Sequence, residues 1–201
     1  DDNIEKLNGL EFTGTIPDAH TLISTHDIAS LGASASIDIT SGIDSTYDVY
    51  EFIFTNMHPA TNNVNFTFQV NADGQSGFNE TITSTTFRAY LSETGGGGAL
   101  GYDTGSDQAQ GTAYQRILNT GTGNENDESS SGVLTLYDPS STTYVKHFVA
   151  DGNGYDHGNW SVTMKTAGYI NTTSAIDEIS FKFDSGNIDA GVIKMYGIAK
   201  S

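Results

Sequence analysis

The 201-residue chain contains no cysteine, only three prolines and only eight lysines and arginines. Without cysteine there can be no disulfide, no thiolate nucleophile and no cysteine-based zinc site. No run of apolar residues approaches the roughly 18 that a membrane-spanning helix requires. These absences exclude cysteine chemistry and a membrane-spanning helix within these residues.

The scarcity of basic residues leaves a large acidic excess. Eight Lys and Arg against 25 Asp and Glu give a formal net charge of −17 at pH 7. A charge of this size repels the phosphates of nucleic acids and the anionic head groups of lipids. We therefore expect neither nucleic acid nor a membrane as a partner.

What the chain does contain favours strands and turns. Ten Tyr, ten Phe and 23 Gly, with many Ser, Thr and Asn residues, are typical of sheets joined by tight turns. The predicted fold is all-β, a two-sheet antiparallel β-sandwich of the jelly-roll type with at most one short helix. We expect residues 22–201 to form this single domain and residues 1–21 to form an N-terminal arm or docking segment.

Apolar and polar residues alternate over several short segments, which indicates strands with one buried face. Clear examples are 36–40, 64–70 and 81–91, whereas 47–57 carries apolar residues on both faces and should be a central strand. Near the C-terminus, 179–183 and 192–198 alternate strictly. Their spacing predicts an antiparallel hairpin.

Other segments are less regular. Residues 107–119 have apolar residues at helical spacing, but a strand over 113–118 explains them equally well. Four successive glycines at 95–98 predict a mobile surface tip, and the polar composition of 121–131 predicts a solvated loop.

The residues predict no catalytic group and no cofactor. The five histidines lack metal-ligand spacing, and no nucleophile elbow or phosphate-binding loop with lysine occurs. A weak Ca²⁺ site could be formed by Asp151, Asn153 and Asp156, although a turn between two strands explains residues 151–158 better. A further, minor hypothesis is an enzyme that cleaves glycans with a pair of carboxylates from distant strands.

Aromatic residues near one loop suggest a second kind of site. Tyr155, Trp160 and Tyr169 could form a platform for a host glycan, because flat rings stack on the C–H faces of sugars. Packing within the sandwich is the alternative explanation for the same residues.

Four sequence segments stand out as a set: GIDSTYDVY at 42–50, NMHPAT at 56–61, GYINTT at 168–173 and SGNIDAGVIKMYGI at 185–198. Together they resemble segments of virion structural proteins of tailed bacteriophages, especially marine ones. The resemblance covers about residues 22–200, and its motifs are structural rather than catalytic.

The resemblance implies a non-enzymatic surface or decoration subunit of the virion, bound to the capsid lattice or to a tail assembly. It further implies other virion proteins as partners and a homo-oligomeric state. The N-terminal arm lies outside the resemblance, but its apolar residues Leu7, Leu10, Phe12 and Ile16 make it a candidate interface with a neighbouring subunit. A carbohydrate-binding module for attachment to host glycans is the alternative function.

Overall fold

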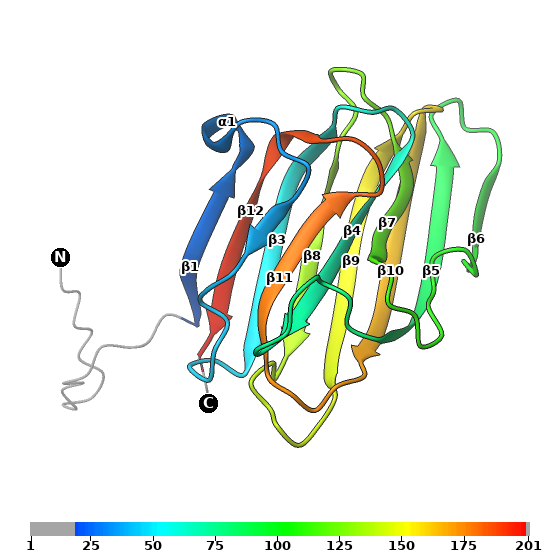
Figure 1. Ribbon diagram of the computed structural model, residues 1–201. Helices are drawn as coiled ribbons and strands as arrows, with labels where there is room; N and C mark the ends of the chain where they lie inside the picture. Colours follow the sequence, from blue (N-terminus) through cyan, green and yellow to red (C-terminus); the bar gives the residue numbers. More distant parts are fainter. Residues whose placement is uncertain (1–18, 200–201) are drawn as a thin grey trace, which may run out of the picture.

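The computed structural model describes residues 19–199, except for the side chains of Asn119 and Thr120. Within this range the chain forms strands and a single one-turn helix (Figure 1). The elements are β1 (His20–Asp27), α1 (Ile28–Leu31), β2 (Ile37–Ile39), β3 (Val49–Pro59), β4 (Val64–Ala72), β5 (Ile82–Ser92), β6 (Gly98–Tyr102), β7 (Gln115–Thr122), β8 (Ser130–Tyr137), β9 (Lys146–Asp156), β10 (Trp160–Ile170), β11 (Ile176–Phe183) and β12 (Ile188–Ile198). No helix in this range is long and apolar enough to cross a membrane.

The strands lie in two antiparallel layers of unequal width, face to face (Figure 1). The large layer has the order β1-β12-β3-β8-β9-β10-β5-β6, and the small layer has the order β7-β4-β11-β2. A single register pair, Thr122 with Asp156, joins β7 to β9 and connects the layers. The predicted all-β sandwich is confirmed.

Phenylalanine rings from both layers form the centre of the core. Phe66 of β4 lies 5.3 Å from Phe54 of β3 and stacks at 6.0 Å on Phe181 of β11, measured between ring centroids. Phe68 of β4 meets Phe148 of β9 edge to face at 5.0 Å. Because all five side chains are buried, they set the separation of the layers.

Two glycines make room for this core where β8 and β9 pair. Gly132 stands opposite Gly152 in the register. A Cβ on Gly132 would lie 2.5 Å from the carbonyl oxygen of Asp151 and 2.8 Å from the ring of Phe54. The side chain of Phe54 therefore occupies space that only glycine leaves free.

We predict that Gly132→Ala lowers the free energy of unfolding by about 1–3 kcal/mol, because the added methyl group overpacks the core. Gly101→Ala is the matched control, since a Cβ there meets no atom within 4 Å. Urea unfolding of both variants measures the difference. Equal midpoints would show that β8 and β9 adjust without strain.

A buried lysine ties together two loops at one end of the sandwich. Lys146 is fully buried, and its Nζ donates hydrogen bonds to the carbonyl oxygens of Tyr144 (3.1 Å) and Thr172 (3.2 Å). Burial lowers the pKa of this amine, and the charges of Asp138 and Glu80 oppose that shift. Since the buried amine donates to carbonyls of both loops, the residue has a structural role.

Several predicted strands are confirmed, but the prediction of a C-terminal hairpin is wrong. Segments 36–40, 47–57, 64–70 and 81–91 correspond to β2, β3, β4 and β5, and β3 is central, between β12 and β8. In contrast, β11 pairs with β4 and β2, whereas β12 pairs with β1 and β3. The two strands are consecutive in sequence but belong to different layers, so 184–187 crosses from one layer to the other.

The irregular segments agree with expectation only in part. Of the two alternatives for 107–119 the strand is the one that forms, since β7 occupies Gln115–Thr122, and the one helix of residues 19–199 lies at Ile28–Leu31. Strand β6 begins at the last of the four glycines. The segment 121–131 is a loop only in its middle, since Thr122 and Ser130 are buried strand residues whose hydroxyls lie 2.7 Å apart.

Candidate functional site

Trp160 and Tyr90 form an aromatic corner on the inner face of the large layer. Side chains alternate along a strand, so Trp160, the first residue of β10, lies on the same face as the buried Val162. Tyr90 of β5 is in register with Val162. The two aromatic rings meet edge to face with their centroids 5.6 Å apart.

Charged groups of both signs complete a small hollow at this corner. The guanidinium of Arg88 lies 5.4 Å above the centre of the Tyr90 ring, and Asp156 stands opposite Trp160 in the register. The hollow measures about 220 Å³ and is lined by Arg88, Tyr90, Asp156, Trp160 and Val162. We call these five residues the aromatic pocket.

Glycine backbones border the indole of Trp160 on two sides. A Cβ built on Gly97 would lie 3.5 Å from Cη2 of the indole, and one on Gly158 would lie 3.3 Å from Cδ1. Residues 95–98, predicted to be a mobile surface tip, are all exposed, and Gly97 among them lies beside Trp160. A flat ring beside a guanidinium and a carboxylate suits a sugar, whose C–H face stacks while its hydroxyls bond the charged groups.

The structure does not bring the three predicted glycan residues together. Tyr155 is paired with Ser161, which places its side chain on the outer face, opposite that of Trp160. Tyr169 shares the outer face but lies eight residues further along β10 than Ser161, about 27 Å away along the strand, with its ring 6.3 Å from His147. Only Trp160 belongs to the pocket.

The partners of Trp160 that sequence reasoning missed are Arg88, Tyr90 and Asp156. Alternation along β5 places Arg88 and Tyr90 on one face, and this signal is present in the sequence. Their meeting with Trp160 depends on the register of β5 with β10, which joins residues about 70 positions apart.

The predicted calcium ligands are also separated. Residues 151–156 do not form a turn, because β9 continues to Asp156 and pairs on both sides, with β8 and with β10. Asp151 pairs with Lys165 at 3.2 Å, and the Asn153 amide donates to the Ser161 hydroxyl at 3.0 Å. Asp156 lies on the opposite face. Among residues 19–199, no group of three or more His, Cys, Asp or Glu side chains could hold a metal ion.

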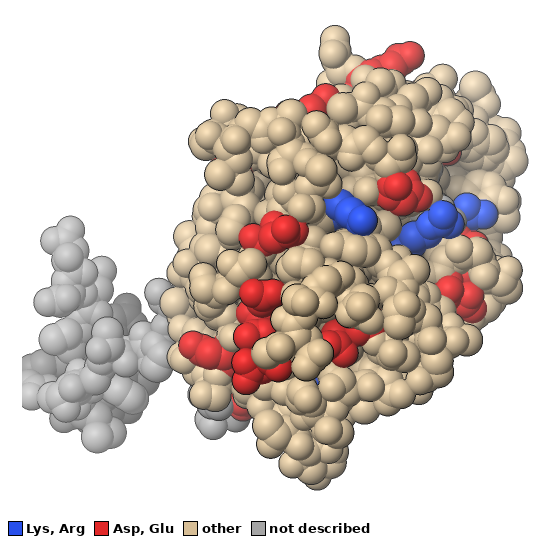
Figure 2. Space-filling model, in the orientation of Figure 1, with Lys and Arg blue, Asp and Glu red and all other residues tan. Residues whose placement is uncertain are grey.

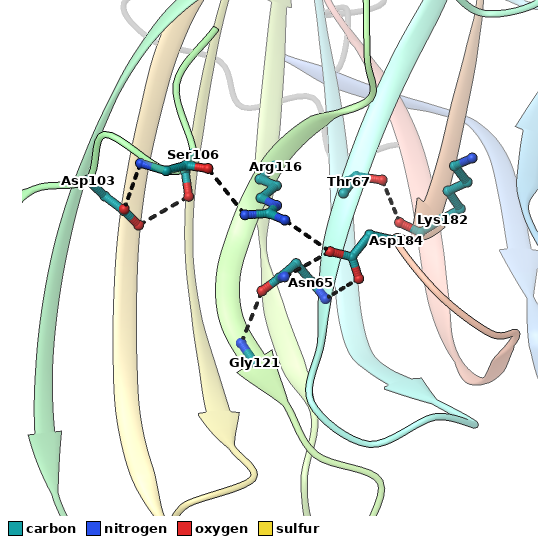
Figure 3. Close-up of polar contacts among 9 residues, drawn as sticks. Asn65, Thr67, Asp103, Ser106, Arg116, Gly121, Lys182 and Asp184 are labelled. Atoms are coloured by element: carbon teal, nitrogen blue, oxygen red, sulfur yellow. Dashed lines mark hydrogen bonds and ion pairs between the residues drawn. The ribbon is translucent and has the colours of Figure 1, made fainter.

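A polar hollow of about 400 Å³ lies on the outer face of the small layer, beside the loop before β7 (Figure 3). Arg116 of β7 donates to the carbonyl of Gly105 (3.2 Å) and pairs with Asp184 (3.5 Å). The Lys182 ammonium lies 3.9 Å from the centre of the Tyr114 ring. On this face, basic side chains are few and lie close together (Figure 2). These contacts fasten the loop to the small layer.

Large apolar side chains form an exposed row at the β5–β6 edge of the large layer. They lie on the outer face of this layer, which points away from the small layer. The register pairs Phe87 with Tyr102 and Ala89 with Leu100, so these side chains share one face with Leu91. We call Phe87, Leu91, Leu100 and Tyr102 the apolar strip. Their exposed fractions are 52, 55, 78 and 49 %.

His58 is held between two acceptors at the far end of β3. Its Nδ1 lies 2.6 Å from Asp189 Oδ1 and its Nε2 lies 3.0 Å from the carbonyl oxygen of Glu125. Burial by itself lowers the pKa of His58. The bonds to Asp189 and Glu125, together with the charges of Asp189 and Glu128, outweigh burial and raise this pKa above its ordinary value.

A raised pKa means that the folded protein binds this proton more tightly than the unfolded chain does. The stabilisation is fully present below the unfolded value of 6.5 and is lost as the pH rises through the raised value. We predict that His58→Gln lowers the unfolding free energy more at about pH 5.5 than at about pH 9. Urea unfolding at both pH values measures this, and Asp189→Asn should weaken the same dependence, because the bond to Glu125 and the charge of Glu128 remain. A pH-independent loss would contradict the prediction.

The predicted interface residues Leu7, Leu10, Phe12 and Ile16 lie outside the described residues. Comparison with known protein families, with characterised proteins and with solved structures found no match to this chain. Its function has to be inferred from its own residues and their arrangement.

Proposed function

We propose that the chain is a non-enzymatic surface or decoration subunit of a bacteriophage virion, bound to the capsid lattice or to a tail assembly. The observation that carries this proposal is the apolar strip at an open sheet edge. Four large apolar side chains remain about half exposed or more in a chain with a net charge of −17. Contiguous apolar surface of this kind marks interaction sites in soluble proteins.

The backbone at the same edge supports the proposal. Within residues 19–199, strand β6 pairs only with β5, so its other side has no neighbouring strand. All five residues of β6 are exposed and none is charged. A partner could add a strand to this edge and cover the strip without burying an unpaired charge.

We predict that Leu100→Lys reduces the amount of the chain in purified virions roughly tenfold or more, because a lysine on an edge strand blocks strand addition. A tagged chain expressed during infection and followed through virion purification measures this. Leu31→Lys is the matched control, since Leu31 is 63 % exposed in α1, away from the strip. Absence of the unmodified chain from virions would reject the proposal.

The aromatic pocket favours a second candidate function, attachment to a host glycan. Trp160 provides the stacking surface, and Arg88 and Asp156 provide a donor and an acceptor for sugar hydroxyls. The hollow of about 220 Å³ suits one sugar unit rather than a long chain. This activity is compatible with a place on a virion surface.

We predict that a glycan selected on an array changes the fluorescence of Trp160, which is the only tryptophan of the chain. Arg88→Ala should weaken binding about tenfold or more, because a hydrogen bond from a charged donor is lost. Tyr144→Ala is the control, an aromatic residue 71 % exposed and outside the pocket. Binding to no glycan, or equal affinity of Arg88→Ala, would exclude the pocket as a glycan site.

A further inference from the structure

The unpaired side of β6 and the apolar strip beside it limit which strands can bind at this edge. An added strand must present apolar residues at every second position on the face of the apolar strip, because side chains alternate across a sheet. It should carry no charge on that face, since β6 offers none in return. Such a strand need be only about as long as β6, which has five residues.

One segment of this chain has this pattern. In residues 10–16, with the sequence LEFTGTI, every even position is apolar or glycine and every odd position is polar. The apolar side chains are those of Leu10, Phe12 and Ile16. The alternation matches a strand with one apolar face, and its only charge, Glu11, belongs to the polar face.

The segment cannot reach β6 of its own molecule. Strand β1 begins at His20, so only residues 17–19 connect it to Ile16, and four residue steps span about 14 Å at most. Strands β1 and β6 lie at opposite edges of the eight-stranded layer (Figure 1). Seven strand spacings separate them, which amounts to roughly 34 Å.

We propose that residues 10–16 of one copy add as a strand to β6 of a neighbouring copy, with Leu10, Phe12 and Ile16 on the face of the apolar strip. This inference rests on the proposed function and names a second copy of the chain as the occupant of the edge. Arm and acceptor edge belong to different surfaces, so the contact is head to tail and generates a ring or a filament.

The open edge at the other side of the large layer, formed by β1, fits the segment less well. Strand β1 has the sequence HTLISTHD, in which Leu22 and Ile23 are the only large apolar residues. Its last two residues, His26 and Asp27, are polar or charged. An apolar strand added there would find few apolar neighbours, whereas β5 and β6 supply four on one face.

Two single variants of the full-length chain test the proposal by complementation. Phe12→Lys places a charge on the apolar face of the arm and leaves the β6 edge intact. Leu100→Lys places a charge on the β6 edge and leaves the arm intact. Sedimentation velocity should show the unmodified chain growing beyond its monomer mass of 21.4 kDa with concentration, and each variant alone remaining a monomer. Mixed, the two should form a one-to-one dimer that grows no further, because only one competent arm meets one competent edge.

Thr13→Lys is the matched control in the arm, since it changes the polar face and should assemble like the unmodified chain. An unmodified chain that stays monomeric, or a mixture of the two variants that does, overturns the proposal. So does a Phe12→Lys variant that assembles normally, which would indicate edge-to-edge pairing of two β6 strands.

The virion experiment separates this inference from the proposed function. If Leu100→Lys is lost from virions while Phe12→Lys is retained, the strip still binds the particle and only the arm proposal fails. If both variants remain on the virion, the strip is not the attachment surface.

Discussion

The phenylalanine rings between the two layers are the constraint on which the other features depend. They join β3 and β9 of the large layer to β4 and β11 of the small layer. The four strands of the small layer therefore cover the middle of the eight-stranded large layer. On one side, β5 and β6 therefore lie beyond β7, the edge of the small layer, whereas β10 still contacts β7 (Figure 1). The aromatic pocket lies on the inner face of this side of the large layer, and the apolar strip lies on its outer face.

Alternation in the sequence predicts which segments are strands and which face of each is buried, and it does so well for β2, β3, β4 and β5. It does not say which strands pair. The segments that became β11 and β12 alternate as a hairpin would, because a strand in either layer of a sandwich has one buried face. Alternation does not predict strand β6, because its glycines hide the alternation of Leu100 and Tyr102.

The same limit applies to the candidate sites. Closeness in sequence grouped Trp160 with Tyr155 and Tyr169, but alternation turns Tyr155 to the other face and strand length carries Tyr169 away. The true neighbours of Trp160 come from β5, and register alone brings them there. The apolar strip likewise needs β6 to be placed beside β5 before Phe87 and Leu100 share one surface.

In the proposed assembly, the acidic surface and the apolar strip act together in selecting a partner. Two copies that each carry a charge of −17 repel one another over a Debye length of about 8 Å at physiological salt. Association must therefore come from short-range terms, which are apolar burial and backbone hydrogen bonds at the edge of β6. A strand without apolar residues at alternate positions supplies too little burial to overcome the repulsion. The acidic excess thus restricts an exposed edge, which would otherwise pair with many strands, to a partner that matches the strip.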